Sequence, residues 1–128
     1  MEKILCKSGE SMLLKKIAKL VIKLSGLDSS DREYLIVVCL SNDFDVTKYL
    51  QIANKTDIKT IIKTLLFLNS HRFILIQKRT NNIKITLDDI RTTKKIQDIA
   101  NLLDIEFVDH IIINKDEYIS CLYDDIKL

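Results

Sequence analysis

The chain has 128 residues, of which 47% are hydrophobic and 30% charged, and its formal net charge is +2 at pH 7. This length suits one globular domain, residues 1–128, and the small net charge excludes an argument for nucleic-acid binding from charge alone. No apolar run approaches the roughly 18 residues of a membrane-spanning helix, and the N-terminus has no secretory signal pattern, so we expect a cytoplasmic protein without a membrane partner.

The first predicted element is an amphipathic helix over residues 11–24, with Gly26 placed to end it. Residues 1–32 are therefore expected to form an N-terminal helix and a linker. Apolar side chains recur along the helix at spacings of three and four residues, which predicts one buried face. The side chains expected on that face are Leu13, Ile17, Leu20, Val21 and Leu24.

Two β-strands are predicted after this helix, and the first carries the stronger signal. The run Tyr34–Leu40 is β-branched and aromatic and has no helical period, which is typical of a strand that is buried on both faces. The run Val46–Ile52 predicts a weaker second strand.

A second helix and a third strand occupy the middle of the chain. Thr56 is expected to cap a helix over residues 57–69. The apolar stripe of this helix contains Ile58, Ile61, Ile62, Leu65 and Leu68. Residues 73–76 then predict a short buried strand, and residues 77–85 a polar loop.

The last third of the chain predicts a third helix and two strands. Thr86 and Asp89 resemble a capping box, with Asp in place of the usual Glu or Gln, at the start of a helix that reaches residue 103. This helix is expected to bury Leu87, Ile90, Ile96, Ile99, Ala100 and Leu103. Residues 106–113 and 117–122 form two strands in a hairpin. The order α-β-β-α-β-α-β-β predicts an α/β protein with a mixed sheet flanked by helices.

The three cysteines give no sign of a disulfide framework or a zinc knuckle. Cys6, Cys39 and Cys121 are odd in number, far apart and without CxxC spacing. Cys39 and Cys121 lie in apolar strand patterns, which favours burial over a nucleophilic role.

Three segments carry motifs that point to one family. Residues 104–120, DIEFVDHIIINKDEYIS, contain a DHIII element within a predicted strand pair. Residues 65–76, LLFLNSHRFILI, are similar to a helix-strand ALLANAAAVILV, and residues 32–42 to an opening strand REHFVVLFLDT. In these three segments the chain resembles the bacterial RadC family, which carries a DNA-repair label and has the same C-terminal strand pair. The resemblance covers about residues 10–128, with a loose match over 43–56. It implies the cytidine-deaminase-like α/β fold of the JAMM/MPN superfamily.

The resemblance also implies a zinc site, which this chain does not match. Family members that bind zinc hold it with two histidines and an aspartate, leaving a position for water. Gln77 and Arg79 occupy the histidine positions here, while Asp89 matches the aspartate and Thr86 the serine before it. Arg79 is always cationic and repels a divalent ion, so we expect neither a metal nor another cofactor. We expect instead that Arg79 pairs with Asp89 bidentately, its guanidinium filling the vacated metal site.

The family's catalytic glutamate is missing as well. The resemblance places it near Thr47, Lys48 and Tyr49, and no glutamate occurs between Glu33 and Glu106. A general base is therefore lost together with the zinc ligands, and we expect no intact metallohydrolase.

The two histidines do not restore a site on their own. His71 is predicted at the surface beside Arg72, and two histidines without a third ligand do not define a zinc site. His110, with Asp109 or Asp89, could form a relocated metal site or an acid–base pair, but the favoured interpretation is a role in packing or in supporting the residues at the ligand positions.

Two functions from different classes follow. The first is a metal-free JAMM/MPN module, a pseudoenzyme that acts through protein contacts, as a homodimer or a scaffold. The second is a diverged RadC metallohydrolase or a DNA-binding repair protein. Complete RadC proteins carry an N-terminal helix-hairpin-helix region, which we expect to be absent here apart from its linking helix. The candidate basic patch for DNA consists of Lys78, Arg79, Lys84, Arg91, Lys94 and Lys95.

Overall fold

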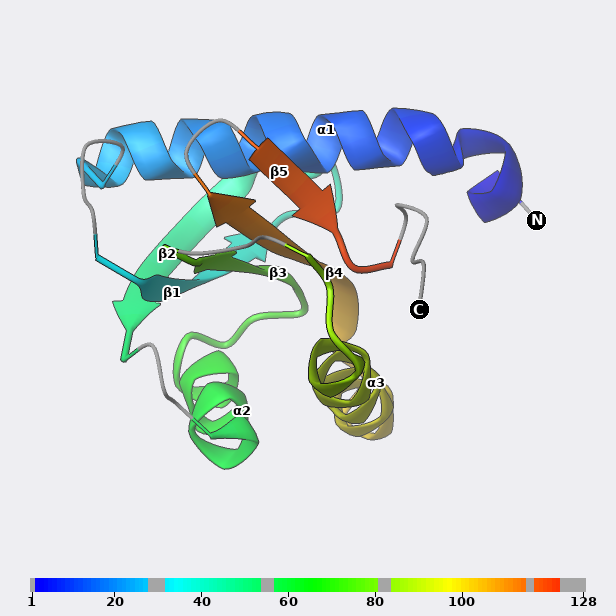
Figure 1. Ribbon diagram of the computed structural model, residues 1–128. Coiled ribbons are helices and arrows are strands. Elements are labelled where there is room, and N and C mark those ends of the chain that lie inside the picture. The colour runs from blue at the N-terminus through cyan, green and yellow to red at the C-terminus, as the bar shows by residue number, and fades with distance from the viewer. Residues whose placement is uncertain (1, 28–31, 54–56, 81–83, 115–116, 123–128) are drawn as a thin grey trace.

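The computed structural model describes residues 2–27, 32–53, 57–80, 84–114 and 117–122, and their side chains from residue 12 onward. Three helices and five strands alternate in the predicted order α-β-β-α-β-α-β-β (Figure 1). Their bounds are α1 Glu2–Ser25, β1 Tyr34–Leu40, β2 Val46–Ile52, α2 Ile58–Phe67, β3 Arg72–Lys78, α3 Leu87–Leu102, β4 Glu106–Asn114 and β5 Glu117–Ser120. None of these helices, within the described residues, combines the length and apolar character that crossing a bilayer requires.

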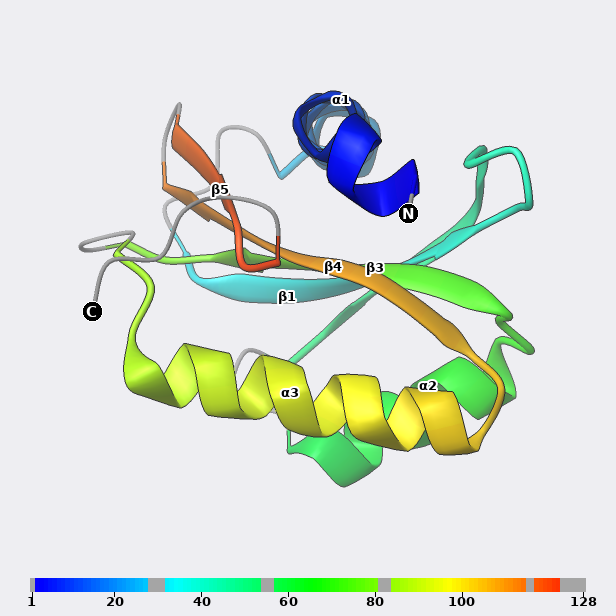
Figure 2. The ribbon, with the colours of Figure 1, turned by 90° about the vertical axis from the view of Figure 1, so that its right-hand side faces the viewer.

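The strands form one mixed sheet in the order β2-β1-β3-β4-β5. The pair β3–β4 is parallel and the other three pairs are antiparallel. Helix α1 lies across one face of the sheet, and α2 and α3 lie side by side on the other (Figures 1 and 2). The predicted mixed α/β fold is therefore confirmed.

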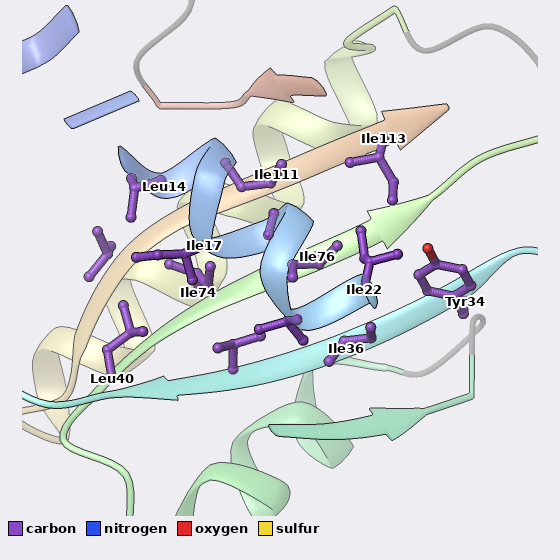
Figure 3. Close-up of a cluster of buried hydrophobic side chains, with 14 residues drawn as sticks. Leu14, Ile17, Ile22, Tyr34, Ile36, Leu40, Ile74, Ile76, Ile111 and Ile113 are labelled. Carbon is purple, nitrogen blue, oxygen red and sulfur yellow. The ribbon is translucent and has the colours of Figure 1, made fainter. Parts of the chain in front are cut away.

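The core beneath α1 contains the larger share of the buried side chains (Figure 3). Leu14, Ile17 and Val21 of α1 contact isoleucines of the sheet, among them Ile74 and Ile76. Each of these side chains is at most 7% exposed, and burying one such aliphatic side chain stabilises the fold by roughly 1.5–3 kcal/mol.

Gly26 ends α1 as predicted. Its φ of 76° is in the left-handed region that side chains disfavour. The backbone N–H of Gly26 donates to the carbonyl of Lys23, and that of Leu27 to Ile22, which are the two hydrogen bonds of a Schellman motif.

The predicted buried face of α1 is only partly right. Ile17 and Val21 are buried, but Leu13, Leu20 and Leu24 are exposed, and the buried set also includes Leu14, Ala18 and Ile22. The helix therefore has two adjacent apolar stripes. Sequence periodicity marked the stripe next to the one that contacts the sheet.

The core on the other face lies between the sheet, α2 and α3. Ile61 and Leu65 of α2 and Ile96 of α3 are buried there, and the rings of Phe73 and Phe107 stack with centroids 4.8 Å apart. The predicted burial of Leu87 and Leu103 is wrong, because both are exposed at the ends of α3. Ile58, Ile62, Leu68, Ile90 and Ile99 are half-buried, while Ala100 is fully buried.

Several predicted element ends also differ, most of all at α1, which begins at Glu2 and not at residue 11. The cap of α2 is Asp57, whose side chain accepts from the N–H of Thr60 at 2.8 Å, while Thr56 lies outside the described residues. Strand β3 includes Gln77 and Lys78, which were assigned to a loop, because β1 and β4 pair with both. Strand β5 ends at Ser120, two residues before its predicted end.

Candidate functional site

The predicted ligand positions come together where β3 ends and α3 begins. Gln77 lies in β3, level with Leu35 of β1 and Ile112 of β4. The backbone N–H of Arg79 donates to the carbonyl of Ile113 at 2.9 Å, which extends the β3–β4 ladder past Lys78. This backbone contact holds Arg79 beside the first turn of α3.

Asp89 serves the helix and the arginine at the same time. Thr86 is the N-cap of α3, and its hydroxyl accepts from the N–H of Asp89 at 3.1 Å. Asp89 Oδ2 accepts from the N–H of Thr86 at 2.8 Å, which completes the predicted capping box. Asp89 Oδ1 accepts from Nη2 of Arg79. The expected pairing of Arg79 with Asp89 is thus confirmed.

The ion pair is monodentate, so the predicted fork-to-fork geometry is wrong. Only Oδ1 of Asp89 meets the guanidinium, because Oδ2 is occupied by the helix cap. The other guanidinium nitrogen, Nη1, donates to the carbonyl of Lys84 at 3.2 Å. The Arg79 side chain therefore fastens the segment before α3 to its first turn.

The environment of Asp89 keeps its carboxylate ionised. Burial raises the pKa of Asp89, but hydrogen bonds from Arg79 and from the N–H of Thr86, with the nearby guanidinium charge, outweigh burial. The pKa of Asp89 therefore lies below its ordinary value of 3.8. A half-buried arginine and a buried aspartate neutralise each other here, with side chains only 15% and 10% exposed.

A second layer of this site is built around His110, in the supporting role that the sequence favoured, although its partners were not predicted. Its Nε2 lies 2.9 Å from Oε1 of Gln77, and its Nδ1 lies 3.1 Å from the hydroxyl of Thr93. Burial lowers the pKa of His110 to about 4, further lowered by Arg79 and partly offset by Asp89. The ring is therefore neutral at pH 7, with Nε2–H donating to Gln77. The signal that could have found this network is a set of polar residues at inward positions of apolar elements.

Cys121 lies next to this layer as a protonated thiol. Burial, then the charges of Asp109 and Asp89, raise the pKa of Cys121 to about 12, with Thr93 acting in the opposite direction. A thiolate is the reactive form of cysteine, so this residue is a poor nucleophile. Cys39 is likewise buried and free, which agrees with the predicted packing role of both, while the side chain of Cys6 lies outside those described.

The donor set at this site does not fit zinc. Structural and catalytic zinc sites use histidine nitrogens, cysteine sulfurs and carboxylate oxygens. Gln77 offers an amide oxygen that is engaged by His110, and Arg79 offers only donors, already directed at Asp89 and Lys84. Among the described residues, no three His, Cys, Asp or Glu side chains are grouped as metal ligands.

The strand register also locates the positions implied for the catalytic glutamate. Lys48 of β2 pairs with Cys39 of β1, which pairs with Phe73 of β3. Phe73 lies four residues before Gln77, or about 13 Å along the strand. The β2 residue nearest in register to Gln77 is instead Ile52, opposite Leu35. Thr47, Lys48 and Tyr49 therefore lie too far along the sheet to act at this site.

Glu33 contacts the segment that follows β3, and sequence reasoning does not predict this contact. Its Oε2 accepts from both the N–H and the hydroxyl of Thr80, each at 3.2 Å. Thr80 directly follows Arg79, so Glu33 fixes the outer end of the same segment. This glutamate holds a loop in place and is exposed.

The six residues of the candidate basic patch do not share one surface. Arg79 is turned inward to Asp89. The Nζ of Lys78 lies 5.8 Å from the ring centroid of Tyr34, and Tyr34 belongs to the core on the α1 side of the sheet. Lys94 pairs with Asp98 at 3.0 Å. The remaining members, Lys84, Arg91 and Lys95, are exposed on or just before α3.

The other histidine and Asp109 lie apart from the Arg79–Asp89 pair. His71 is exposed before β3, six residues or about 20 Å along the strand from Gln77. Asp109 is fully buried, and its carboxylate accepts from the hydroxyl of Ser120 and the N–H of Leu122. Asp109 thus holds β5 and the turn that follows it.

Two cavities frame the α2–α3 face. One of about 80 Å³, with room for only a few water molecules, lies beside Gln77, His110 and Thr92. A larger one of about 400 Å³ lies at the opposite end of the sheet, beside Lys48 and His71. The polar side chains of the larger cavity bond mainly to backbone carbonyls, as Lys48 does to that of Leu68. The larger space is therefore not at the predicted site.

Comparison with known proteins supports the resemblance that the sequence suggested. The family model of the RadC-like JAB domain matches residues 14–126. A UPF0758 protein of Histophilus somni (strain 2336) is 31% identical over 101 residues, covering 73% of this chain and 46% of that protein. A UPF0758 protein of Haemophilus influenzae (strain 86-028NP) is 32% identical over 104 residues, covering 76% of this chain and 47% of that protein. The chain spans about half the length of these curated relatives.

Proposed function

Because this chain belongs to the RadC-like JAB domain family, we propose that it is a metal-free member, a pseudoenzyme that acts through protein contacts. The partner is another protein or a second copy of the chain, and the location is the cytoplasm. Zinc-dependent hydrolysis is not part of this proposal, since the donor set of Gln77, Arg79 and Asp89 does not fit the metal.

The Arg79–Asp89 ion pair is the observation that carries the proposal. It places a permanent positive charge against the carboxylate that the resemblance assigns to zinc. A guanidinium and a divalent ion about 4 Å apart repel each other by roughly 8 kcal/mol at an effective dielectric constant of 20. The metal would have to displace the Arg79 side chain before it reached Asp89.

The surroundings of the ion pair support the same conclusion. Glu33 is engaged by Thr80, and the β2 position level with Leu35 is the apolar Ile52, so that β2 position offers no carboxylate as a general base. The adjoining cavity of about 80 Å³ is too small for a peptide or nucleotide substrate.

Metal content tests the proposal directly. Protein purified without chelators is expected to contain far less than one zinc per chain after dialysis, measured by elemental analysis. Stoichiometric zinc that survives dialysis and disappears on Asp89→Ala would overturn the proposal.

A matched gain-of-metal variant makes this test sharper. The double substitution Gln77→His and Arg79→His supplies two imidazoles beside Asp89, and it is expected to bind zinc in calorimetric titration. Adding Asp89→Ala should weaken that binding by tenfold or more. If the double variant binds no zinc, the positions of these side chains are not those of a lost metal site.

Binding to DNA is the weaker alternative, because Arg79 is paired with Asp89 and Lys78 lies over Tyr34, apart from the exposed basic residues of α3. The proposal predicts that DNA binding is weak and nonspecific, and that Lys84→Ala with Arg91→Ala changes no specific interaction. Tight, sequence-selective binding that these substitutions abolish would favour the DNA function instead.

A further inference from the structure

Helix α1 presents a row of leucines to solvent on its outer side. Leu13, Leu20 and Leu24 are 43%, 50% and 61% exposed, although Leu14 and Val21 beside them are fully buried. α1 is the helix that covers this face of the sheet, and its outward side faces away from the other elements (Figures 1 and 2). A row of exposed leucines on a packed helix is typical of an interaction surface.

The spacing of these residues is that of a coiled-coil seam. Leu13, Ile17, Leu20 and Leu24 follow one another at intervals of four, three and four residues, as positions d, a, d and a of a heptad do. We call these four residues the Leu13–Leu24 seam. It extends about 17 Å along the helix, or three turns. Of these four residues, Ile17 alone is buried against the sheet. The edge of the seam on the Ile17 side therefore adjoins the core, and the opposite edge is exposed to solvent.

Lysines border the open edge of the seam. Lys16 and Lys23 occupy the g positions and are exposed. Charged side chains at e and g positions select the partner of a coiled coil. The two e positions, Leu14 and Val21, are buried in the core. Over residues 12–25, a partner helix on the seam would therefore meet charged flanking residues on one side alone, and these are lysines.

This charge pattern argues against a second copy of α1 as the occupant. In an antiparallel pair the g positions of the two helices face each other, which would bring lysines against lysines. In a parallel pair the lysines would face Leu14 and Val21, which carry no charge. An occupant with carboxylates at its flanking positions meets Lys16 and Lys23 favourably in either direction.

We infer that the Leu13–Leu24 seam binds an acidic amphipathic helix of another protein, with apolar residues at a and d spacing and Glu or Asp beside them. This inference rests on the proposed role of the chain as a protein-contact module. A seam of three turns is at the small end of protein interfaces, so the complex is weak and reversible, and salt weakens it further.

Two synthetic peptides test the inference against the full chain. The acidic peptide has about four heptads with Ile at a, Leu at d and Glu at e and g, so that its own charges oppose self-pairing. The basic peptide carries Lys at e and g. Fluorescence anisotropy is expected to show binding of the acidic peptide and at least tenfold weaker binding of the basic one. Equal binding of both peptides would overturn the charge argument.

Substitutions locate the binding surface. The double substitution Leu20→Gln and Leu24→Gln is expected to weaken binding of the acidic peptide by tenfold or more, while the circular dichroism spectrum of the protein stays unchanged. Leu102→Gln is the matched control, because Leu102 is 84% exposed on α3, across the sheet. Lys16→Glu with Lys23→Glu should reverse the preference between the two peptides. An equal loss with Leu102→Gln means that the peptide does not bind the seam, and the inference falls.

Three further measurements separate the other occupants and the proposed function. Sedimentation velocity that shows a dimer, lost on Leu20→Gln with Leu24→Gln, would assign the seam to a second copy. Binding to phosphatidylglycerol vesicles in place of the acidic peptide would assign it to a membrane surface. Either result overturns the inference. Zinc analysis of the same preparation tests the proposed function separately. A metal-free protein that does not bind the acidic peptide contradicts the inference about the seam alone, whereas stoichiometric zinc contradicts the proposed function.

Discussion

The two long helices, α1 and α3, distribute polar and apolar side chains in opposite ways. Toward the sheet, α1 buries Leu14 and Val21 and no polar side chain among those described, whereas α3 buries Asp89 and Thr93 in its first half. Toward solvent, α1 carries a row of exposed leucines beside its lysines, whereas α3 carries mainly charged side chains and exposes leucines only at its ends.

This difference separates the apolar contacts that stabilise the fold from the polar contacts that form the candidate site. Buried polar groups destabilise a core unless they are hydrogen-bonded, and each one on α3 has a partner: Asp89 has Arg79, and Thr93 has His110. These bonds link the residues at the positions that match the family's zinc ligands. α1 contributes apolar burial and leaves a row of leucines exposed on its outer side.

Matched leucine substitutions on α1 should show the largest contrast. Leu14→Ala removes a side chain with no exposed surface and is expected to lower the free energy of unfolding by about 4 kcal/mol. Leu13→Ala makes the same chemical change one residue away at a half-exposed position and should lower it by less than about 1 kcal/mol. Urea unfolding measures both. Equal losses would mean that α1 is rotated from the orientation described.

The pH dependence of stability should report the polar side of α3. The pKa of His110 is about 4 in the folded protein and 6.5 in the unfolded chain, so the unfolded state binds more protons between these values. Stability is therefore complete above pH 6.5 and falls by roughly 3 kcal/mol as the pH drops to 4. Asp89, whose pKa is lowered, adds a further loss only below about pH 4.

Histidine substitutions assign that pH dependence. His110→Gln should flatten the slope of unfolding free energy between pH 6.5 and 4, even where it lowers stability overall. His71→Gln, at the exposed histidine, is the matched control and should keep the slope. A slope that survives His110→Gln would show that another group is responsible.

Breaking the ion pair should have a smaller effect. Arg79→Ala leaves Asp89 with only its helix-cap partner and is expected to cost about 2 kcal/mol. Asp89→Asn keeps an acceptor for the cap and removes the unpaired charge, so the double variant should be more stable than the sum of the two losses predicts. Strict additivity in chemical denaturation would show that the two side chains do not interact.

Removing the helix cap should have the smallest effect of the series. Thr86→Ala deletes the hydroxyl that accepts from the N–H of Asp89 and is expected to cost about 1 kcal/mol. Thr86→Ser retains that oxygen and should restore most of the loss in thermal unfolding. If Ser and Ala are equivalent, the cap contributes little here.

Much of the local structure was predictable from neighbouring residues. The bounds of β1 and β2 and the Thr86–Asp89 capping box agree with the sequence, because β-branched runs and capping pairs act over a few residues. The Arg79–Asp89 pair was also expected, but from a family resemblance and in a bidentate form that the cap at Oδ2 prevents.

The remainder depended on contacts that no local pattern contains. Periodicity indicates the wrong face of α1 because Leu13 and Leu14 begin equally apolar stripes, and only contact with the sheet decides which stripe is covered. The sequence predicts Gln77 in a polar loop, whereas pairing with Leu35 and Ile112 places it in β3.

The sequence by itself determined the element order, the family and the absence of two histidines from the zinc-ligand positions. Those properties depend on residue identity and on hydrogen bonds between near neighbours. Tertiary structure decided that His110 reaches Gln77, that Glu33 holds Thr80, and that α1 keeps a leucine row outside. The first two contacts join residues more than thirty positions apart, and the third feature depends on which face of the helix meets the sheet. Such features form only when the whole core packs.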